Sequence, residues 1–133
     1  MPRLPVISVV DDDAPLREAI VCLMRSLGYD ALSFGSAEEF LGSPYVDTTS
    51  CLIADVQMPG MSGFEVCARL KEDERTRLIP IVMVTSLSDL HDRIRGIEVG
   101  ADDFLSKPFH PAELSARARS LLKLKQFTDE LED

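Results

Sequence analysis

Residues 6–13 of the sequence are VISVVDDD, a short apolar run followed directly by three aspartates. The run Val6–Val10 is too short for a helix and has the length of a buried strand. Beyond Asp13, a candidate N-cap, apolar residues three and four positions apart predict a helix that stops at Gly28: Leu16, Ile20, Leu23, Met24 and Leu27. The stretch therefore predicts a strand followed by a helix, which is one βα unit.

The same alternation of a short apolar run and a helical stretch recurs four more times. The further predicted strands are residues 31–34, 51–54, 79–84 and 104–105. The runs at 51–54 and 79–84 are almost continuously apolar, as expected for central strands covered on both faces. Five βα units in succession predict an α/β fold with a parallel sheet.

Four further helices are predicted from capping residues and apolar spacing. Residues 36–39, SAEE, form a capping box before a short second helix that Pro44 ends. The third helix spans about residues 62–72, and the fifth, the longest, begins at Pro111. The fourth helix, which Gly100 closes, is marked by apolar residues at helical spacing: Leu87, Leu90, Ile94 and Ile97.

The composition predicts one soluble globular domain. The 133 residues are 45% hydrophobic and 28% charged, which fits neither a disordered chain nor a membrane protein. The net charge of -9 would repel a polyphosphate backbone, so we expect no direct binding of nucleic acid by this chain. The first apolar run is far shorter than the roughly 18 residues of a membrane span. Three widely spaced cysteines favour a reducing compartment, so we expect a cytoplasmic protein without a membrane partner.

Polar side chains follow four of the five predicted strands, namely Asp11 and Asp12, Asp55, Thr85, and Lys107. Because the carboxyl ends of parallel strands lie at one edge of a sheet, we expect these side chains to share one crevice. Two like charges about 4 Å apart repel by roughly 4 kcal/mol at an effective dielectric near 20, so clustered carboxylates must take up protons or bind a cation. An all-oxygen cluster beside a lysine predicts a Mg²⁺ site that receives a phosphoryl group.

The residue types suggest a role for each member of this cluster. Asp55 is the candidate nucleophile, because it stands alone at the end of a central strand before a glycine-rich loop. Asp11 and Asp12 would hold the metal ion. Lys107 would pair with a phosphoryl or carboxylate oxygen, and Thr85 would donate a hydrogen bond from its hydroxyl.

Four ordered motifs resemble the receiver domain of two-component response regulators: VVDDD at 9–13, DVQMPGMSG at 55–63, VTS at 84–86 and GADDFLSKPF at 100–109. The resemblance spans roughly residues 5–122. It implies a flavodoxin-like (βα)5 fold, a doubly wound five-stranded sheet in the order 2-1-3-4-5. We therefore expect a receiver domain over residues 1–122.

The resemblance also implies a chemistry. A partner histidine kinase would phosphorylate Asp55, and Mg²⁺ would be held by Asp12, Asp55 and the backbone carbonyl of Gln57, with Asp11 in the outer shell of ligands. The chain would then be a phosphoacceptor rather than an enzyme, although it would assist its own phosphorylation and dephosphorylation.

A conformational switch is implied by the same resemblance. Thr85 would move toward the phosphoryl group as the aromatic ring of Phe104 turns inward, and the surface of the fourth helix, fifth strand and fifth helix would change. Related proteins often have Tyr at this position, so Phe104 keeps the ring and lacks the hydroxyl. The peptide bond between Lys107 and Pro108 is expected to be cis.

Other classes of protein fit the residues less well. A haloacid-dehalogenase-type phosphatase, which also forms an aspartyl phosphate, needs a second Asp where Gln57 stands. An EF-hand would need Glu at the position of Cys22. The output stays open between a stand-alone docking protein and a module that controls a C-terminal effector domain. Residues 64–74 resemble receivers joined to cyclic-di-GMP domains, whereas the first forty residues are also similar to receivers of transcription factors.

Residues 123–133 are expected to extend the last helix. No Gly or Pro interrupts the apolar steps of three and four residues: Leu121, Leu124, Thr128 and Leu131. One interpretation is a frayed, solvated tail. The preferred interpretation is the first heptads of a coiled-coil linker, through which two copies of the chain pair and pass the signal to the effector domain.

Overall fold

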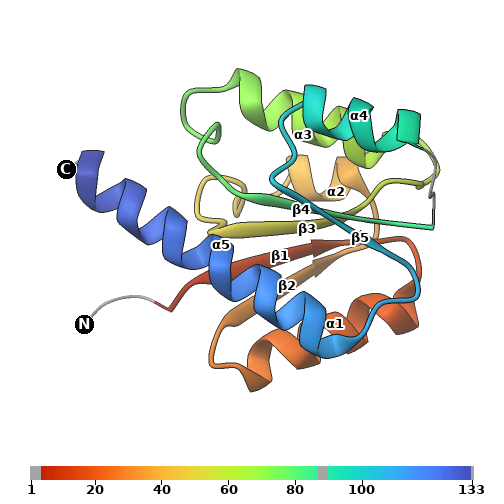
Figure 1. Ribbon diagram of the computed structural model, residues 1–133, viewed down its shortest axis with the longest axis horizontal. Helices are drawn as coiled ribbons and strands as arrows, with labels where there is room; N and C mark the ends of the chain where they lie inside the picture. The colour runs from red at the N-terminus through yellow and green to blue at the C-terminus, as the bar shows by residue number, and fades with distance from the viewer. Residues whose placement is uncertain (1–3, 87–89, 133) are drawn as a thin grey trace.

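The computed structural model describes residues 4–86 and 90–132. Within these residues five strands form one parallel sheet: β1 (Val6–Val10), β2 (Asp30–Phe34), β3 (Cys51–Asp55), β4 (Ile81–Thr85) and β5 (Asp103–Ser106). Their order is β2-β1-β3-β4-β5 (Figure 1). The predicted α/β class, the parallel sheet and the strand order 2-1-3-4-5 are therefore confirmed.

Helices cover both faces of this sheet. In the described part of the chain they are α1 (Ala14–Ser26), α2 (Ala37–Leu41), α3 (Gly63–Glu72), α4 (Leu90–Glu98) and α5 (Pro111–Glu132). α1 and α5 lie on one face, and α2, α3 and α4 lie on the other (Figure 1). Each face has its own apolar core, one built around Met24 and Leu114 and the other around Phe40 and Leu70. This double cover explains why β3 and β4 are buried along their whole length, as their apolar sequences predict.

Local signals place the starts of three helices. Asp13 caps α1 by accepting a hydrogen bond from the backbone N–H of Leu16 at 3.2 Å. Ser36 caps α2 in the same way, and Ser62 caps α3. The predicted capping box differs in one bond, because the Glu39 carboxylate accepts from the N–H before Ser36 rather than from that of Ser36 itself. Side-chain oxygens thus satisfy backbone donors that a helix leaves without partners.

Two predicted boundaries were wrong by two or three residues. β4 begins at Ile81 rather than at residue 79, because Pro80 lacks a backbone N–H and the N–H of Ile79 donates to a turn. α2 ends at Leu41 and not at Pro44, since the N–H of Gly42 already closes the last turn. Neither difference moves a residue of the candidate site.

The apolar pattern predicted α4 correctly but does not mark its buried face. Ile94 is 43% exposed and Ile97 is 67% exposed, whereas Gly96 is buried. The aromatic ring of Phe104 lies against Gly96, where a Cβ atom would collide with it. The ring therefore fills the contact that an apolar helix side chain would otherwise make. Leu87 lies outside the described residues.

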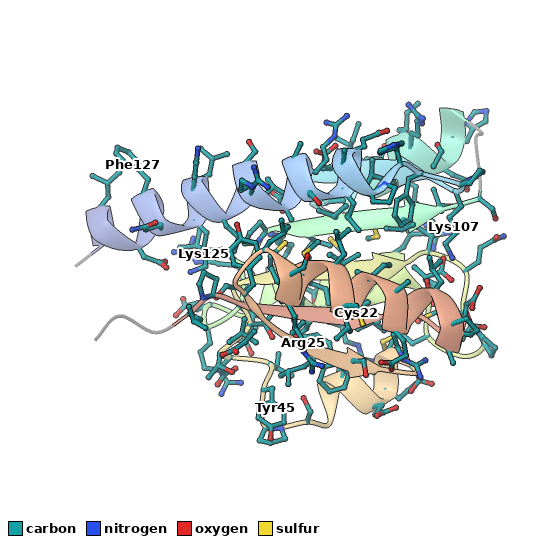
Figure 2. All side chains as sticks on the ribbon, turned by 90° about the horizontal axis from the view of Figure 1, so that it is seen from below. Cys22, Arg25, Tyr45, Lys107, Lys125 and Phe127 are labelled. Atoms are coloured by element: carbon teal, nitrogen blue, oxygen red, sulfur yellow. The ribbon has the colours of Figure 1, made fainter. Side chains whose placement is uncertain are left out.

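α5 continues past the sheet. Its buried apolar side chains, Leu114, Ala118 and Leu122, lie four positions apart, and among the side chains described in this helix the last buried one is Leu122. The helix itself runs on to Glu132, and along this last part Phe127 is 61% exposed and points away from the sheet (Figure 2). No helix within the described ranges is both long and apolar enough to cross a membrane.

Candidate functional site

Three carboxylates meet where β1 and β3 end. The two strands are adjacent and parallel, with Val10 paired to Ala54, so the residues that follow them leave the sheet side by side. Oxygen atoms of Asp11, Asp12 and Asp55 lie within 4.8 Å of one another. Asp11 and Asp55 are buried, and Asp12 is exposed. The expected convergence of these side chains is therefore observed.

Lys107 reaches this cluster from the loop after β5. Its Nζ lies 3.2 Å from Oδ2 of Asp11 and 3.5 Å from Oδ2 of Asp55. Figure 2 shows Lys107 at one end of the molecule and Phe127 at the other. The peptide bond between Lys107 and Pro108 is cis, as the resemblance implied. One ammonium group thus lies against two buried carboxylates.

The local charges shift the acidity of these groups. Burial raises the pKa of Asp55 to about 6, and the charge of Asp11 adds to the rise, while Lys107 and the backbone N–H of Gln57 oppose it. Burial lowers the pKa of Lys107, but the charges of Asp55 and Asp11 outweigh this and raise it above its ordinary value. At neutral pH, Asp55 is therefore mainly a carboxylate and Lys107 is an ammonium ion.

The cluster fits a divalent metal ion. Three carboxylates and one ammonium leave two negative charges in excess, and the available ligand atoms are all oxygens. Oxygen ligands of this kind suit Mg²⁺, which binds through one or two carboxylates and keeps several waters.

Gln57 lies beside the carboxylate cluster, because its backbone N–H donates a hydrogen bond to Oδ1 of Asp55 at 3.3 Å. Its side-chain oxygen accepts a hydrogen bond from the hydroxyl of Ser86 at 3.0 Å.

The two residues of the expected switch lie on β4 and β5. Thr85 is the last residue of β4 and is buried, and its backbone carbonyl accepts from the N–H of Lys107 at 2.8 Å. Phe104 is half-buried on β5 and packs against Gly96 of α4. The backbone of Thr85 is therefore tied directly to the loop that carries the lysine.

The sequence analysis missed Arg17. Its guanidinium donates from Nη1 to the backbone carbonyl of Asp11 at 2.7 Å. A basic residue so near the start of a helix opposes the helix dipole, which favours acidic groups there. In the sequence, Arg17 lies close after the acidic run Asp11–Asp13. A basic residue in this unfavourable position was the signal that it interacts with a nearby group that compensates its charge.

Comparison with known proteins places the chain in a family. The sequence matches the family described as "Response regulator receiver domain" over residues 7–119. Transcriptional regulatory protein GltR of Pseudomonas aeruginosa is 38% identical over 122 residues, and the phosphate regulon transcriptional regulatory protein PhoB of the same organism is 39% identical over 117 residues. These alignments cover 92% and 88% of this chain but only 50% and 51% of the relatives. The chain thus spans about half the length of the curated relatives it matches.

Solved structures share the fold. Chemotaxis protein CheY4 of Vibrio cholerae has a TM-score of 0.83 at 26% identity, with 89% of this chain and 98% of that chain covered. Response regulator DrrB of Thermotoga maritima has a TM-score of 0.82 at 31% identity, with 92% of this chain and 54% of that chain covered. The sequence match, which extends over most of the chain, and the shared sheet order agree. This chain belongs to the response regulator receiver domain family.

Proposed function

We propose that, in the cytoplasm, a partner histidine kinase transfers a phosphoryl group to Asp55. A carboxylate oxygen of Asp55 would form a bond to phosphorus as the P–N bond of the phosphohistidine breaks, and the electron pair of that bond would return to the imidazole nitrogen. The observation that carries this proposal is geometric: the carboxylate of Asp55 is buried, and its Oδ2 lies 3.5 Å from Nζ of Lys107. The chain would act as a phosphoacceptor rather than as an enzyme with a separate substrate.

The surrounding residues would serve this transfer in different ways. Lys107 would neutralise an oxygen of the phosphoryl group, and its present contact with Asp55 supports that role. Asp11, Asp12, Asp55 and the carbonyl of Gln57 would hold Mg²⁺, which supplies positive charge to the phosphoryl oxygens when it is bound. The carboxylate oxygens within 4.8 Å of one another support this ligand set.

Intact-mass measurement tests the phosphoacceptor. With Mg²⁺ and a small phosphodonor such as acetyl phosphate, the protein should gain one acid-labile phosphoryl group. Asp55→Asn should gain none, whereas the matched control Asp13→Asn should gain the group as the unchanged protein does, because Asp13 is engaged as a helix cap. Equal uptake by Asp55→Asn would contradict the assignment.

Two further variants test the expected switch. Lys107→Ala and Thr85→Ala should still permit phosphorylation but should weaken the conformational change, because a switch requires contacts that differ between the two states. NMR chemical shifts around Phe104 and on the surface formed by α4, β5 and α5 measure that change. A full response in either variant would show that the signal travels by another route.

For the output, we propose a C-terminal effector domain that regulates transcription. The names of relatives such as GltR and PhoB support a transcriptional role, and this chain matches only about half of their length. They offer no support for the alternative output through cyclic-di-GMP. The net charge of -9 argues that the effector domain, rather than this chain, would contact DNA. The open reading frame beyond Asp133 decides between this output and a stand-alone receiver.

The extension over residues 123–133 would connect the receiver to that domain and pair with a second copy of the chain. Its described part is helical up to Glu132, and Leu131 is 74% exposed. The pairing should be weak, because coiled coils normally need three or four heptads. Sedimentation of the chain and of a version that ends at Leu122 tests it. Identical self-association of the two lengths would exclude the extension as a pairing element.

A further inference from the structure

Arg17 joins the start of α1 to the end of β1. Its Nη1 donates a hydrogen bond of 2.7 Å to the backbone carbonyl of Asp11, and its side chain is 18% exposed. Its Nε is buried without a hydrogen bond, 3.9 Å from an oxygen of Glu18. A buried donor without a hydrogen bond is unfavourable. The burial of Arg17 leaves one of its own donors without a hydrogen bond. Its burial is therefore better explained by the hydrogen bond that it donates to the carbonyl of Asp11.

Asp11 forms hydrogen bonds through its backbone and both carboxylate oxygens. Its N–H donates to the carbonyl of Phe34 at 3.2 Å, and its carbonyl accepts from Arg17. One carboxylate oxygen accepts from the N–H of Asp13 at 2.9 Å, and the other accepts from Lys107 at 3.2 Å. Of these contacts, the bond from Arg17 is the one that fixes the carbonyl group.

That carbonyl belongs to the peptide unit between Asp11 and Asp12. Because a peptide unit is planar, a contact that holds its oxygen also sets the direction in which the chain continues into Asp12. Asp12 is exposed, yet its carboxylate lies in the same cluster as those of Asp11 and Asp55. Arg17 thus constrains the positions of two neighbouring carboxylates through one peptide plane.

We propose that Arg17 is a positioning residue for the divalent-cation site of this receiver. By holding the peptide between Asp11 and Asp12, it presents both carboxylates toward Asp55 before the cation binds. Partners behind the ligands of a metal site commonly change metal affinity 10- to 100-fold when they are lost. The inference rests on the proposed function, since it concerns the metal ion on which that function depends.

Arg25 provides a matched control on the same helix. Its Nη2 donates to the backbone carbonyl of Ala31 at 3.0 Å, so it also joins α1 to a neighbouring strand. Figure 2 shows Arg25 well away from Lys107, near the other end of the helix. Arg17→Met and Arg25→Met therefore remove the same kind of hydrogen bond, and only the first is next to the carboxylates.

The experiment measures binding of Mn²⁺ to the unphosphorylated protein by electron paramagnetic resonance, with Mg²⁺ as competitor. Mn²⁺ accepts the same oxygen ligands as Mg²⁺. We expect Arg17→Met to bind Mn²⁺ at least fivefold more weakly than the unchanged protein, and Arg25→Met to stay within twofold. Arg17→Lys should lie between these values, and it decides alone if Arg17→Met does not fold.

Phosphorylation by acetyl phosphate over a range of Mg²⁺ concentrations gives a second readout. Arg17→Met should need more Mg²⁺ for half-maximal rate but should approach the unchanged maximal rate, which a general loss of structure would not produce. A Mn²⁺ affinity loss below fivefold in Arg17→Met, or an equal loss in Arg25→Met, would overturn the inference, and if Arg17→Met does not fold, a loss below twofold in Arg17→Lys would do so. Failure of the unchanged protein to take up a phosphoryl group would instead overturn the proposed function and leave the Mn²⁺ comparison valid.

Discussion

Charged groups are arranged in opposite ways at the edge of the sheet where the strands begin, the amino edge, and at the edge where they end, the carboxyl edge. At the amino edge, Asp102 accepts from the N–H of Ile81 at 2.7 Å and lies 3.6 Å from Lys71. Lys71 in turn donates to the carbonyls of Ile79 at 2.8 Å and Arg77 at 3.0 Å. One acid and one base thus satisfy each other and the backbone around them. At the carboxyl edge, three carboxylates lie together and one lysine contacts two of them, Asp11 and Asp55.

This comparison separates charged groups that stabilise the fold, at the amino edge, from charged groups of the candidate functional site, at the carboxyl edge. Matched charges and hydrogen bonds at the amino edge join α3, β4 and β5 into one structure. At the carboxyl edge, burial and, after it, the charge of Asp11 raise the pKa of Asp55 to about 6 and so lower the stability of the ionised protein. We expect substitutions at the first edge to cost stability, and neutral substitutions at the second to increase it.

Asp55→Asn should have the largest effect on this contrast. The rise of the Asp55 pKa from 3.8 to about 6 corresponds to at most about 3 kcal/mol. A folded-state pKa above the unfolded value means that stability falls as pH rises between about 4 and 6. Asp55→Asn should therefore be more stable than the unchanged protein above pH 6, and equally stable below pH 4. Urea unfolding across this pH range measures the difference.

An exposed carboxylate provides the control for that measurement. Asp30 lies at the start of β2, at the opposite edge of the sheet from Asp55. Asp30→Asn makes the same chemical change at this exposed position and provides the comparison for Asp55→Asn. A gain for Asp55→Asn that is the same at pH 4 and pH 7 would show that ionisation of the buried Asp55 carboxylate is not its cause.

Asp102→Ala should give the opposite sign, a loss of about 2 kcal/mol, because the N–H of Ile81 would be buried without its side-chain acceptor. Phosphoryl uptake at Asp55 should stay normal. The matched control is Asp47→Ala, which breaks the exposed ion pair with Arg75 at 3.6 Å and should cost less than about 1 kcal/mol. Equal losses from the two variants in urea unfolding would contradict the role given to Asp102.

Asp12→Ala should remove the stabilisation that Mg²⁺ provides. At a Mg²⁺ concentration ten times the dissociation constant, bound ligand stabilises a folded protein by about 1.4 kcal/mol. Thermal unfolding with and without Mg²⁺ measures this contribution, which Asp12→Ala should lose and Asp13→Ala should keep. If both variants lost the stabilisation by Mg²⁺, binding of the ion would depend on Asp13 as well as on Asp12, which would contradict the assignment of Asp13 as a cap only.

Asp13→Ala should have the smallest effect, a loss of about 1 kcal/mol from the missing cap of α1. Asp13 lies beside the carboxylates of the carboxyl edge, yet we expect it to stabilise the fold as the charged residues of the amino edge do. Asp13→Asn, which keeps the capping oxygen, should retain most of the stability. If Asp13→Ala were instead more stable than the unchanged protein, its charge would belong with those of Asp11 and Asp12.

Sequence patterns predicted the features that depend on neighbouring residues or on strand order. The caps Asp13 and Ser36 are local signals, and the meeting of Asp11, Asp55 and Lys107 follows from the parallel order of the strands. The features that depend on packing between distant segments could not be predicted in this way.

The buried face of α4 and the role of Arg17 are two such features. Gly96 contacts the sheet only because the Phe104 ring, eight residues later, fits against it. The bond from Arg17 to the carbonyl of Asp11 depends on the angle between α1 and β1, which no spacing of residue types specifies. Helical periodicity therefore predicts that α4 forms, whereas tertiary packing determines which face of α4 is buried.

The length of α5 gives the receiver a mechanical property. The ten residues from Lys123 to Glu132 extend the helix by about 15 Å beyond its last buried side chain, at 1.5 Å per residue. A rigid rod of that length would move its tip by about 3 Å if its base tilted by about 10° on the sheet. Shifts of 1–2 Å are enough to rearrange packed interfaces. An extension of this length would act as a lever arm, because it would convert a small rotation at the sheet into a displacement large enough to change a contact with a neighbouring molecule.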